Sequence, residues 1–169
     1  MSDTLAQNSE NLAEGQQVFT ACALIHHKFD GVEKVFLAKR AATKKFLPSV
    51  YEIPGGHVDY GEDMVAGLKR EIQEEFGMHV IVGDPFAVFT YLNEVKRSHS
   101  IEVVYFATFA DPLENITLHP EDHSAFGWFS KDDFYQAYTD HKGADDSEFK
   151  VVERAFELLN GSMLDFATE

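Results

Sequence analysis

The chain has 169 residues, 44% of them hydrophobic and 25% charged, with a formal net charge of −15. That length suits one globular domain, and the negative charge argues against a nucleic-acid polymer as a partner, since such proteins usually carry a basic patch. No apolar run approaches the roughly 18–20 residues that cross a bilayer, and the polar, acidic start lacks the features of a signal peptide. Because Cys22 is the only cysteine, no intrachain disulfide can form and a cytoplasmic location is expected.

Strand-forming residues dominate the first third of the chain. The run Val-Phe-Thr-Ala-Cys-Ala-Leu-Ile is typical of a buried strand, and the Asp30-Gly31 turn signal joins it to a second strand as a hairpin. A basic loop comes next, followed by a short piece that the proline after it keeps extended. These four segments are expected at 16–27, 33–39, 40–48 and 50–53.

Residues 63–76 have the pattern of an amphipathic helix. Asp63 falls in the first turn, where the helix dipole favours an anion, and Gly77 is placed to end the helix in a left-handed conformation. The apolar stripe consists of Val65, Leu68, Ile72 and Phe76. At about 100° per residue, the glutamates of the last two turns cluster roughly 110° away from that stripe. One side of the helix should therefore pack on a sheet while the neighbouring edge faces a cleft.

The second half of the chain mixes strands and helices. The sequence Gly-Asp-Pro at 83–85 is expected to break the first of these strands, and Ser130 is expected to cap a short helix. The expected order is a broken strand, a strand, a polar loop, a short strand and two helices, at 79–95, 100–110, 111–124, 125–129, 131–138 and 148–159. Helices that can cover both faces of a mixed β-sheet indicate an α/β/α sandwich. We expect a single domain over 16–160, between a flexible tail at 1–15 and a C-terminal tail at 161–169.

Glu71, Glu74 and Glu75 have the spacing that places side chains on one helix face. Three ionised carboxylates there repel one another unless a cation lies between them, and hard oxygen ligands suit Mg²⁺, Mn²⁺ or Ca²⁺. Arg70 can pair with Glu74 and steady the cluster, and Gly55 can bring a backbone carbonyl to the same metal. The alternative is a solvated acidic face. A metal site of this kind suits the hydrolysis of a phosphoanhydride, with a carboxylate taking the proton of the attacking water.

The stretch from Gly56 to Met78 resembles the Nudix box of the Nudix hydrolases, the MutT-like family. The family pattern is glycine, five residues, glutamate, seven residues, Arg-Glu, an aliphatic residue, any residue, Glu-Glu, any residue, glycine and an aliphatic residue. The matching positions are Gly56, Glu62, Arg70, Glu71, Ile72, Glu74, Glu75, Gly77 and Met78. Methionine is a tolerable version of the last position, and the order of elements over about 17–160 is also similar to the family fold.

The resemblance implies hydrolysis of a nucleoside diphosphate linked to another moiety, with Mg²⁺ or Mn²⁺ as the cofactor. The implied metal ligands are the carbonyl of Gly55 and the carboxylates of Glu71, Glu74 and Glu75. The residues expected to take part in catalysis are Glu71, Glu75, Arg70 and Glu62. Glu71 or a glutamate outside the box would be the general base, because family members differ in this respect. Arg70 would orient the glutamates, and Glu62 can hydrogen-bond within the site or orient water.

Five residues outside the helix are weaker candidates for binding the substrate. Lys39 and Arg40 end a strand where family members often bring a basic side chain to the phosphates, although a solvated strand end would look the same. Phe46 and Tyr51 could stack a base, but core packing explains aromatic residues equally well. His57 lies within the glycine loop and could touch the substrate.

Four further residues have open roles. Glu102 lies on a strand and could reach the site, while Glu121, His119 and His123 belong to a late polar loop. Several relatives supply an extra carboxylate or a lid from that loop, which makes Glu121 a candidate auxiliary base or metal ligand and the two histidines candidate metal ligands. The alternative for all three loop residues is simple exposure to solvent.

The sequence does not select one substrate. The default is a nucleoside triphosphate, including a damaged one, and the alternatives are a nucleotide sugar, ADP-ribose or a dinucleoside polyphosphate. A function of another class is ligand sensing by a Nudix domain that has lost catalysis, which the intact box disfavours. The isomerase branch of the superfamily is disfavoured because it needs a catalytic cysteine. A homodimer could form through an exposed strand or the loop at 40–48.

Overall fold

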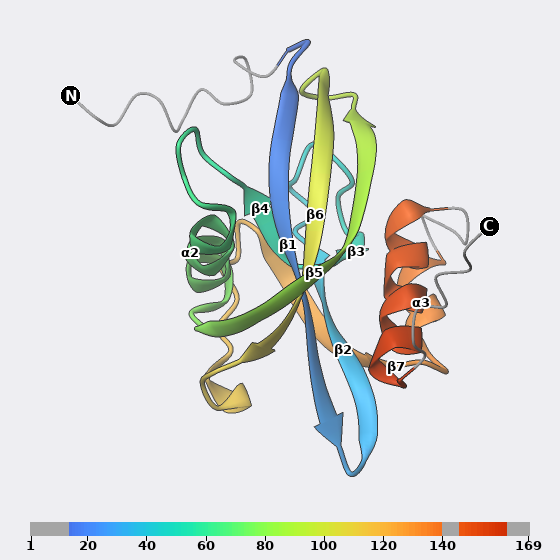
Figure 1. Cartoon of the computed structure of the whole chain (residues 1–169). Coiled ribbons are helices and arrows are strands. Elements are labelled where there is room, and N and C mark those ends of the chain that lie inside the picture. Colours follow the sequence, from blue (N-terminus) through green and yellow to red (C-terminus); the bar gives the residue numbers. More distant parts are fainter. Residues whose placement is uncertain (1–13, 140–145, 162–169) are drawn as a thin grey trace, which may run out of the picture.

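The computed structural model describes residues 14–139 and 146–161 (Figure 1). The strands are β1 (Gln17–Phe29), β2 (Val32–Arg40), β3 (Tyr51–Glu52), β4 (Gly55–His57), β5 (Val80–Asn93), β6 (Ser98–Phe109) and β7 (His123–Ser130). The helices are α2 (Met64–Phe76) and α3 (Ser147–Leu159), with short 3₁₀ turns at η1 (Leu113–Asn115) and η2 (Phe134–Tyr138). None of the described helices is long and apolar enough to cross a membrane.

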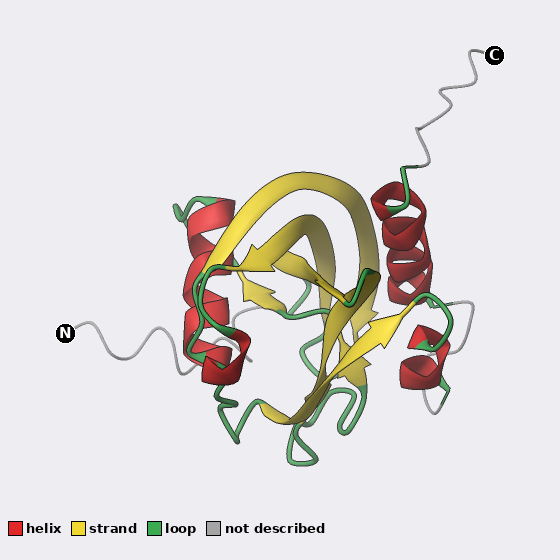
Figure 2. Ribbon diagram, turned by 90° about the horizontal axis from the view of Figure 1, so that it is seen from below, coloured by secondary structure: helices red, strands yellow, loops and turns green. Residues whose placement is uncertain are grey.

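The strands of the described chain form one mixed seven-stranded sheet with a helix on each side. Its main path runs β3-β2-β1-β6-β5, while β4 pairs with β1 and β7 pairs with β2. Helix α2 covers one face and α3 the other, and the view from below shows both helices flanking a strongly curved sheet (Figure 2). The predicted α/β/α sandwich is therefore confirmed.

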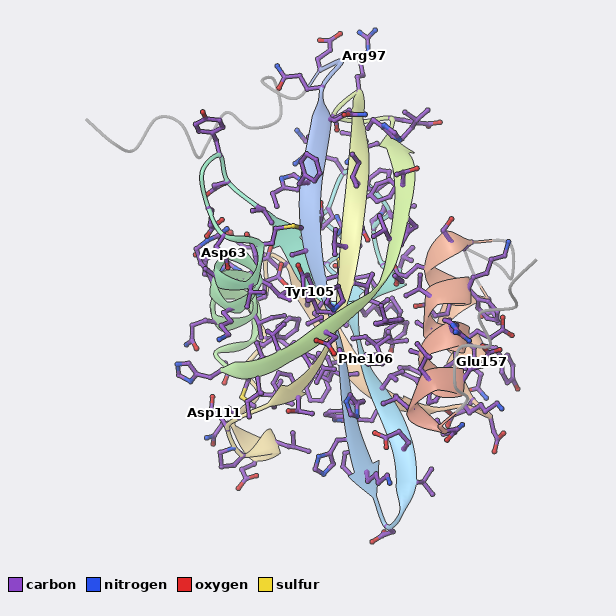
Figure 3. All side chains as sticks on the ribbon, in the orientation of Figure 1. Asp63, Arg97, Tyr105, Phe106, Asp111 and Glu157 are labelled. Atoms are coloured by element: carbon purple, nitrogen blue, oxygen red, sulfur yellow. The ribbon has the colours of Figure 1, made fainter. Side chains whose placement is uncertain are left out.

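Strands β1 and β6 run parallel at the centre of the sheet, with Thr20 opposite Glu102. Successive side chains of a strand point to opposite faces, so these two strands contribute to both helix-facing layers. Tyr105 and Phe106 of β6 illustrate this alternation (Figure 3), because Tyr105 packs with the cluster under α2 and Phe106 with the cluster under α3. The same alternation directs Glu102 to the α3 side of the sheet.

Helix α2 is fixed to the sheet by its apolar stripe. Leu68, Ile72 and Phe76 have no exposed surface, and burying such side chains stabilises the fold by about 1.5–3 kcal/mol each. Asp63 is the N-cap rather than a residue of the first turn, and its carboxylate accepts a hydrogen bond from the N–H of Ala66 at 3.0 Å. At the other end Gly77 has φ 64°, the left-handed conformation predicted for it.

Two local predictions are wrong. Residues 83–85 do not break the strand, because β5 continues through them with register shifts between Val82 and Ala87. A proline is tolerated there because β5 ends the path of the described sheet and its N–H side need not pair. Ser130 does not cap a helix, because it is the last residue of β7 and pairs with Lys34 of β2. Its N–H donates to Asp133, and the residues that follow form a 3₁₀ turn.

The predicted domain boundaries fall largely outside the described residues, which exclude 1–13, 140–145 and 162–169. Glu14 and Gly15 were assigned to the N-terminal tail, yet both are bound to the turn between β5 and β6. The N–H of Gly15 donates to the carbonyl of Arg97 at 2.8 Å, and the guanidinium of Arg97 lies 2.7 Å from the carboxylate of Glu14.

Candidate active site

A continuous cleft runs from the edge of α2 to the N-terminal end of α3. It consists of three adjoining cavities of about 320, 190 and 110 Å³, all lined by Arg40 and Tyr91. Glu71 and Glu75 line the largest cavity, at the α2 end. Glu102 and Glu148 line the other two, toward α3. The cleft thus joins the predicted metal site to a second polar region on the α3 side of the sheet.

The glycine pair of β4 forms the wall against which Glu71 packs. A Cβ atom on Gly56 would lie 2.3 Å from the carboxyl carbon of Glu71, and one on Gly55 would lie 2.3 Å from the carbonyl oxygen of Ala21. Gly55 requires glycine because it faces backbone, whereas a Cβ at Gly56 would displace the carboxylate end of Glu71. The Glu71 side chain can therefore lie directly on the backbone of β4.

Arg70 holds the carboxylates at the mouth of the site. Its guanidinium donates to Glu62 at 2.9 and 3.1 Å, to Glu71 at 2.7 Å and to Glu74 at 3.3 Å. It also donates to the carbonyl of His57 at 3.2 Å. Hydrogen bonds from Arg70 and from the N–H of Asp59 lower the pKa of Glu62 to about 2. This geometry supports the predicted orienting role of Arg70 and gives Glu62 a place beside it.

The carboxylate of Glu75 lies where a cation would stabilise it. Its Oε2 atom is buried and has no hydrogen-bond partner among the described residues. Burial, followed by the charges of Glu52 and Glu71, raises the pKa of Glu75 well above its usual value, against the opposing effect of Lys44. A divalent cation would satisfy such an oxygen, and carboxylates are the ligands that Mg²⁺ and Mn²⁺ prefer. The residues present therefore fit the implied metal.

The complete ligand set remains a prediction. In the part of the chain that the structure describes, no three carboxylate, imidazole or thiol groups already converge on a common point. Glu74 lies at the rim, with 60% of its side chain exposed and its carboxylate turned to Arg70. Gly55 lines the smallest cavity. Burial raises the pKa of Glu71 while the hydrogen bond from Arg70 opposes that rise.

The structure separates the five predicted substrate-binding residues into two groups. Arg40, Phe46 and His57 line the cleft. The ammonium of Lys39 instead lies 5.8 Å from the ring centre of Tyr51, and Tyr51 packs on the core under α3. Neither of these two lines a cavity of the described cleft. For Lys39 and Tyr51 the geometry favours packing over substrate contact.

Arg40 stands in the middle of the cleft with a fixed orientation. Its Nε donates to the carbonyl of Phe46 at 3.1 Å, and its Nη1 donates to Glu52 at 3.0 Å. Phe46 in turn lies parallel to Tyr91, with ring centres 5.8 Å apart and an interplanar angle of 6°. Burial, with a smaller effect of Lys96, lowers the pKa of His57 to about 4, so this imidazole is neutral near pH 7. The middle of the cleft therefore offers one guanidinium and an aromatic pair.

The late loop contributes Asp122 rather than Glu121. Glu121 is exposed, whereas Asp122 lines the largest cavity together with Glu71, Glu75 and Lys44. Burial alone would raise the pKa of Asp122, but the hydrogen bond and charge of Lys44 lower it. The sequence signal for Asp122 is its place next to Glu121 in the same polar loop, and the pairing of His123 with Arg40 of β2 brings it to the cleft.

His119 of this loop and His123, the first residue of β7, lie beside carboxylates of the cleft. Nδ1 of His119 lies 2.8 Å from Asp122. His123 is buried against the ring of Phe76, and its Nε2 lies 2.9 Å from Glu52. Glu52 is therefore held from two sides, by His123 and by Arg40, and it was not recognised as a candidate from the sequence.

Comparisons with known proteins agree with this fold. The NUDIX domain model matches residues 19–151, which is most of the chain. A CTP pyrophosphohydrolase of Escherichia coli (strain K12) is 28% identical over 103 residues, covering 61% of this chain and 71% of that protein. The m7GpppN-mRNA hydrolase NUDT17 of Xenopus laevis is 40% identical over 48 residues, covering 28% of this chain and 16% of that protein. The chain spans less than half the length of several of the curated relatives it matches.

A solved structure supports the same assignment at the level of the fold. The crystal structure of a C. elegans Ap4A hydrolase binary complex superposes with a TM-score of 0.67 at 22% sequence identity, covering 85% of this chain and 97% of that chain. The family match over most of the chain, the complete box and the shared fold lead to one conclusion: the chain belongs to the Nudix hydrolase family.

Proposed function

We propose that this protein is a metal-dependent pyrophosphohydrolase that cleaves a nucleoside diphosphate linked to another moiety. The observation that carries the proposal is the buried, unpartnered Oε2 of Glu75, at the end of a cleft that also contains Arg40 and the Phe46–Tyr91 pair. This arrangement provides separate places for a cation, for phosphates and for a base. A solvated acidic face would not bury one of its carboxylates in this way.

Glu71 and Glu75, with Glu74 and the Gly55 carbonyl, would hold the metal. A bound Mg²⁺ or Mn²⁺ would add positive charge at the phosphate oxygens and lower the pKa of an attacking water. Arg70 keeps its bonds to Glu62 and orients the box glutamates. Arg40 and Lys44 line the same cavity and supply positive charge to the phosphates.

In the reaction, a water oxygen forms a bond to phosphorus while the bond to the bridging anhydride oxygen breaks. A carboxylate takes the proton of the water, and the leaving phosphate group receives a proton from solvent or retains its negative charge. Glu71 is the box residue proposed as the base. Asp122 is the matching candidate outside the box, because it lines the same cavity and its lowered pKa keeps it ionised.

The default substrate is a nucleoside triphosphate, including a damaged one. The similarity to a CTP pyrophosphohydrolase over 71% of that protein supports this choice. Nucleotide sugars, ADP-ribose and dinucleoside polyphosphates are the alternatives. The shared fold with an Ap4A hydrolase is a reason to test dinucleoside polyphosphates as well. We place the protein in the cytoplasm, acting on small nucleotides rather than on a nucleic-acid polymer, with a homodimer as a further proposal.

A substrate panel with identification of products by mass tests the proposal. Purified protein with Mg²⁺ or Mn²⁺ should cleave at least one nucleoside triphosphate, nucleotide sugar, ADP-ribose or dinucleoside polyphosphate. Glu75→Gln should lower kcat by a factor of about 10² or more, while Glu153→Gln, on the exposed face of α3, should leave kcat unchanged. If the whole panel stays intact and Glu75→Gln retains nucleotide affinity, the domain is a ligand sensor and the hydrolase proposal is wrong.

A further inference from the structure

The α3 end of the cleft is rich in hydrogen-bond acceptors. Four carboxylates line its 190 Å³ cavity: Glu52, Glu102, Asp146 and Glu148. Arg40 is the one cation among the described residues that line this cavity, and its guanidinium already donates to Glu52 and to the carbonyl of Phe46. A ligand in this cavity must therefore supply donors, because buried acceptors left without them cost free energy.

The carboxylate of Glu148 already accepts hydrogen bonds from other residues of the protein. Its Oε1 accepts a hydrogen bond from the N–H of Ile53 at 2.8 Å and another from the hydroxyl of Tyr138 at 2.9 Å. These contacts tie α3 to the strand that leads into the glycine loop. The position of Glu148 in the cavity wall thus has a structural explanation.

Glu102 lies deeper and keeps capacity for a ligand. Its side chain comes from the centre of β6, and the residue is only 8% exposed. The thiol of Cys22 lies 3.5 Å from its Oε2, and Tyr91 shares a hydrogen bond with the carboxyl group. A carboxylate can accept about four hydrogen bonds, so these two partners leave it able to accept more. Glu102 lines both cavities at this end of the cleft.

Two carboxylates, a neutral thiol and a neutral phenol surround Glu102. Cys22 faces it from β1, Tyr91 from β5, Glu148 from α3 and Glu52 from β3. Burial, followed by the charge of Glu148, raises the pKa of Glu102 to about 7. In both protonation states the group retains an acceptor oxygen for an amino group, whereas only the protonated form can donate to a carbonyl. The site therefore favours an amino group over an oxo group at the edge of a ring.

We propose that Glu102 is a specificity-determining residue whose carboxyl group accepts a hydrogen bond from an exocyclic amino group of the substrate's base. The aromatic pair of Phe46 and Tyr91 lies beside it, at the place where a planar ring would stack. Amino-bearing bases are then preferred to their oxo counterparts. The inference rests on the proposed function only in taking the ligand to be a nucleotide.

Binding of nucleoside monophosphates tests this without turnover. Two pairs report on an amino group. UMP has an oxo group and N3–H where CMP has an amino group and an acceptor N3, whereas IMP differs from GMP only by lacking the 2-amino group. Calorimetry on the wild-type protein should show the amino member of at least one pair binding about tenfold or more tightly. Equal affinities in both pairs, or no binding of any nucleotide, would overturn the inference. This test uses the wild-type protein alone.

The variant Glu102→Gln is isosteric and keeps an acceptor for Cys22, so its amide can present N–H groups to the ligand. The affinity ratio should then fall to about one or below, while Glu148→Gln should keep the wild-type ratio even where it lowers stability. A ratio unchanged in Glu102→Gln would refute the assignment. A base preference in binding without hydrolysis of any substrate would refute the proposed function alone, and hydrolysis without a base preference would refute this inference alone.

Discussion

Glu75 provides a direct test of the metal site through the stability of the metal-free protein. Its buried Oε2 has no partner among the described residues, and Glu52, Glu71 and Asp122 all oppose its ionisation. The variant Glu75→Gln removes the charge and adds two N–H groups that can donate hydrogen bonds to these carboxylates. We therefore expect this substitution of a proposed metal ligand to stabilise the protein when metal is absent.

The magnitude follows from the cost of an unsatisfied buried polar group, which is about 1–3 kcal/mol. For a domain of this size each kcal/mol changes Tm by about 2–4 °C, so Tm should rise by about 2–12 °C. The size of this gain in Tm depends on pH. Because the folded-state pKa of Glu75 is raised, its contribution to stability is present below its ordinary pKa of 4.5 and is lost as the pH rises through the folded pKa. The gain in Glu75→Gln should therefore appear near pH 7.5 and shrink near pH 4.

Thermal unfolding followed by circular dichroism, with a chelator present, measures this difference. The matched control is Glu74→Gln, because Glu74 is 60% exposed and its ion pair with Arg70 contributes at most about 1 kcal/mol. Added Mg²⁺ at about 100 times its Kd should stabilise the wild type by about 2.7 kcal/mol and Glu75→Gln by much less. A lower Tm for metal-free Glu75→Gln at pH 7.5, or an equal gain at pH 4, would refute the reasoning.

Three other predictions concern the support of the site. Gly56→Ala places a Cβ 2.3 Å from the carboxyl carbon of Glu71, so kcat should fall by about 10² or more in steady-state assays, and activity within threefold of wild type would contradict the packing. Leu68→Ala opens a cavity in a fully buried contact and should cost about 2–5 kcal/mol in urea unfolding; a loss below 1 kcal/mol would mean that α2 is not held as described. Glu62 has a pKa lowered from 4.5 to about 2, so its contribution to stability is present above pH 4.5 and is lost as the pH falls toward 2. Glu62→Gln should flatten the pH dependence of Tm in that window, and an unchanged slope would exclude the pairing with Arg70.

The features that could be predicted from the sequence are those encoded locally. The apolar stripe of α2 and the terminating Gly77 depend on spacings within one helix, and the structure places them as expected. Of the three glutamates, Glu71 and Glu75 line the cleft while Glu74 lies exposed at its rim. Ser130 shows how a local signal loses to tertiary pairing, because its serine could cap a helix but its backbone extends the ladder between β7 and β2. Gly-Asp-Pro at 83–85 is a turn signal that a strand at the end of the sheet accommodates with register shifts.

The remaining half of the cleft depends on sheet register and could not be read from local patterns. Glu52, Glu102 and Glu148 come from β3, β6 and α3, and they meet only because distant strands align. The same holds for the stacking of Phe46 on Tyr91. Lys39 and Arg40 are adjacent in sequence, but the register between β2 and β7 shifts between them. Their side chains therefore have different surroundings. Only Arg40 reaches the cleft.

The parallel pairing of β1 with β6 has a consequence for how the protein folds. It brings the thiol of Cys22 to Glu102 across 80 positions of the chain, and the helix with the box glutamates lies inside that loop. Loops of this length close slowly because their entropy is lost before the distant contacts form. During synthesis, α2 leaves the ribosome after β1 and β4, on which it packs, but before β5 and β6 complete the sheet. A chain truncated before residue 98 keeps the partners of α2 in β1 and β4 but lacks Tyr105 and Ala107 of β6, which complete the core under this helix. Such a chain should aggregate instead of folding.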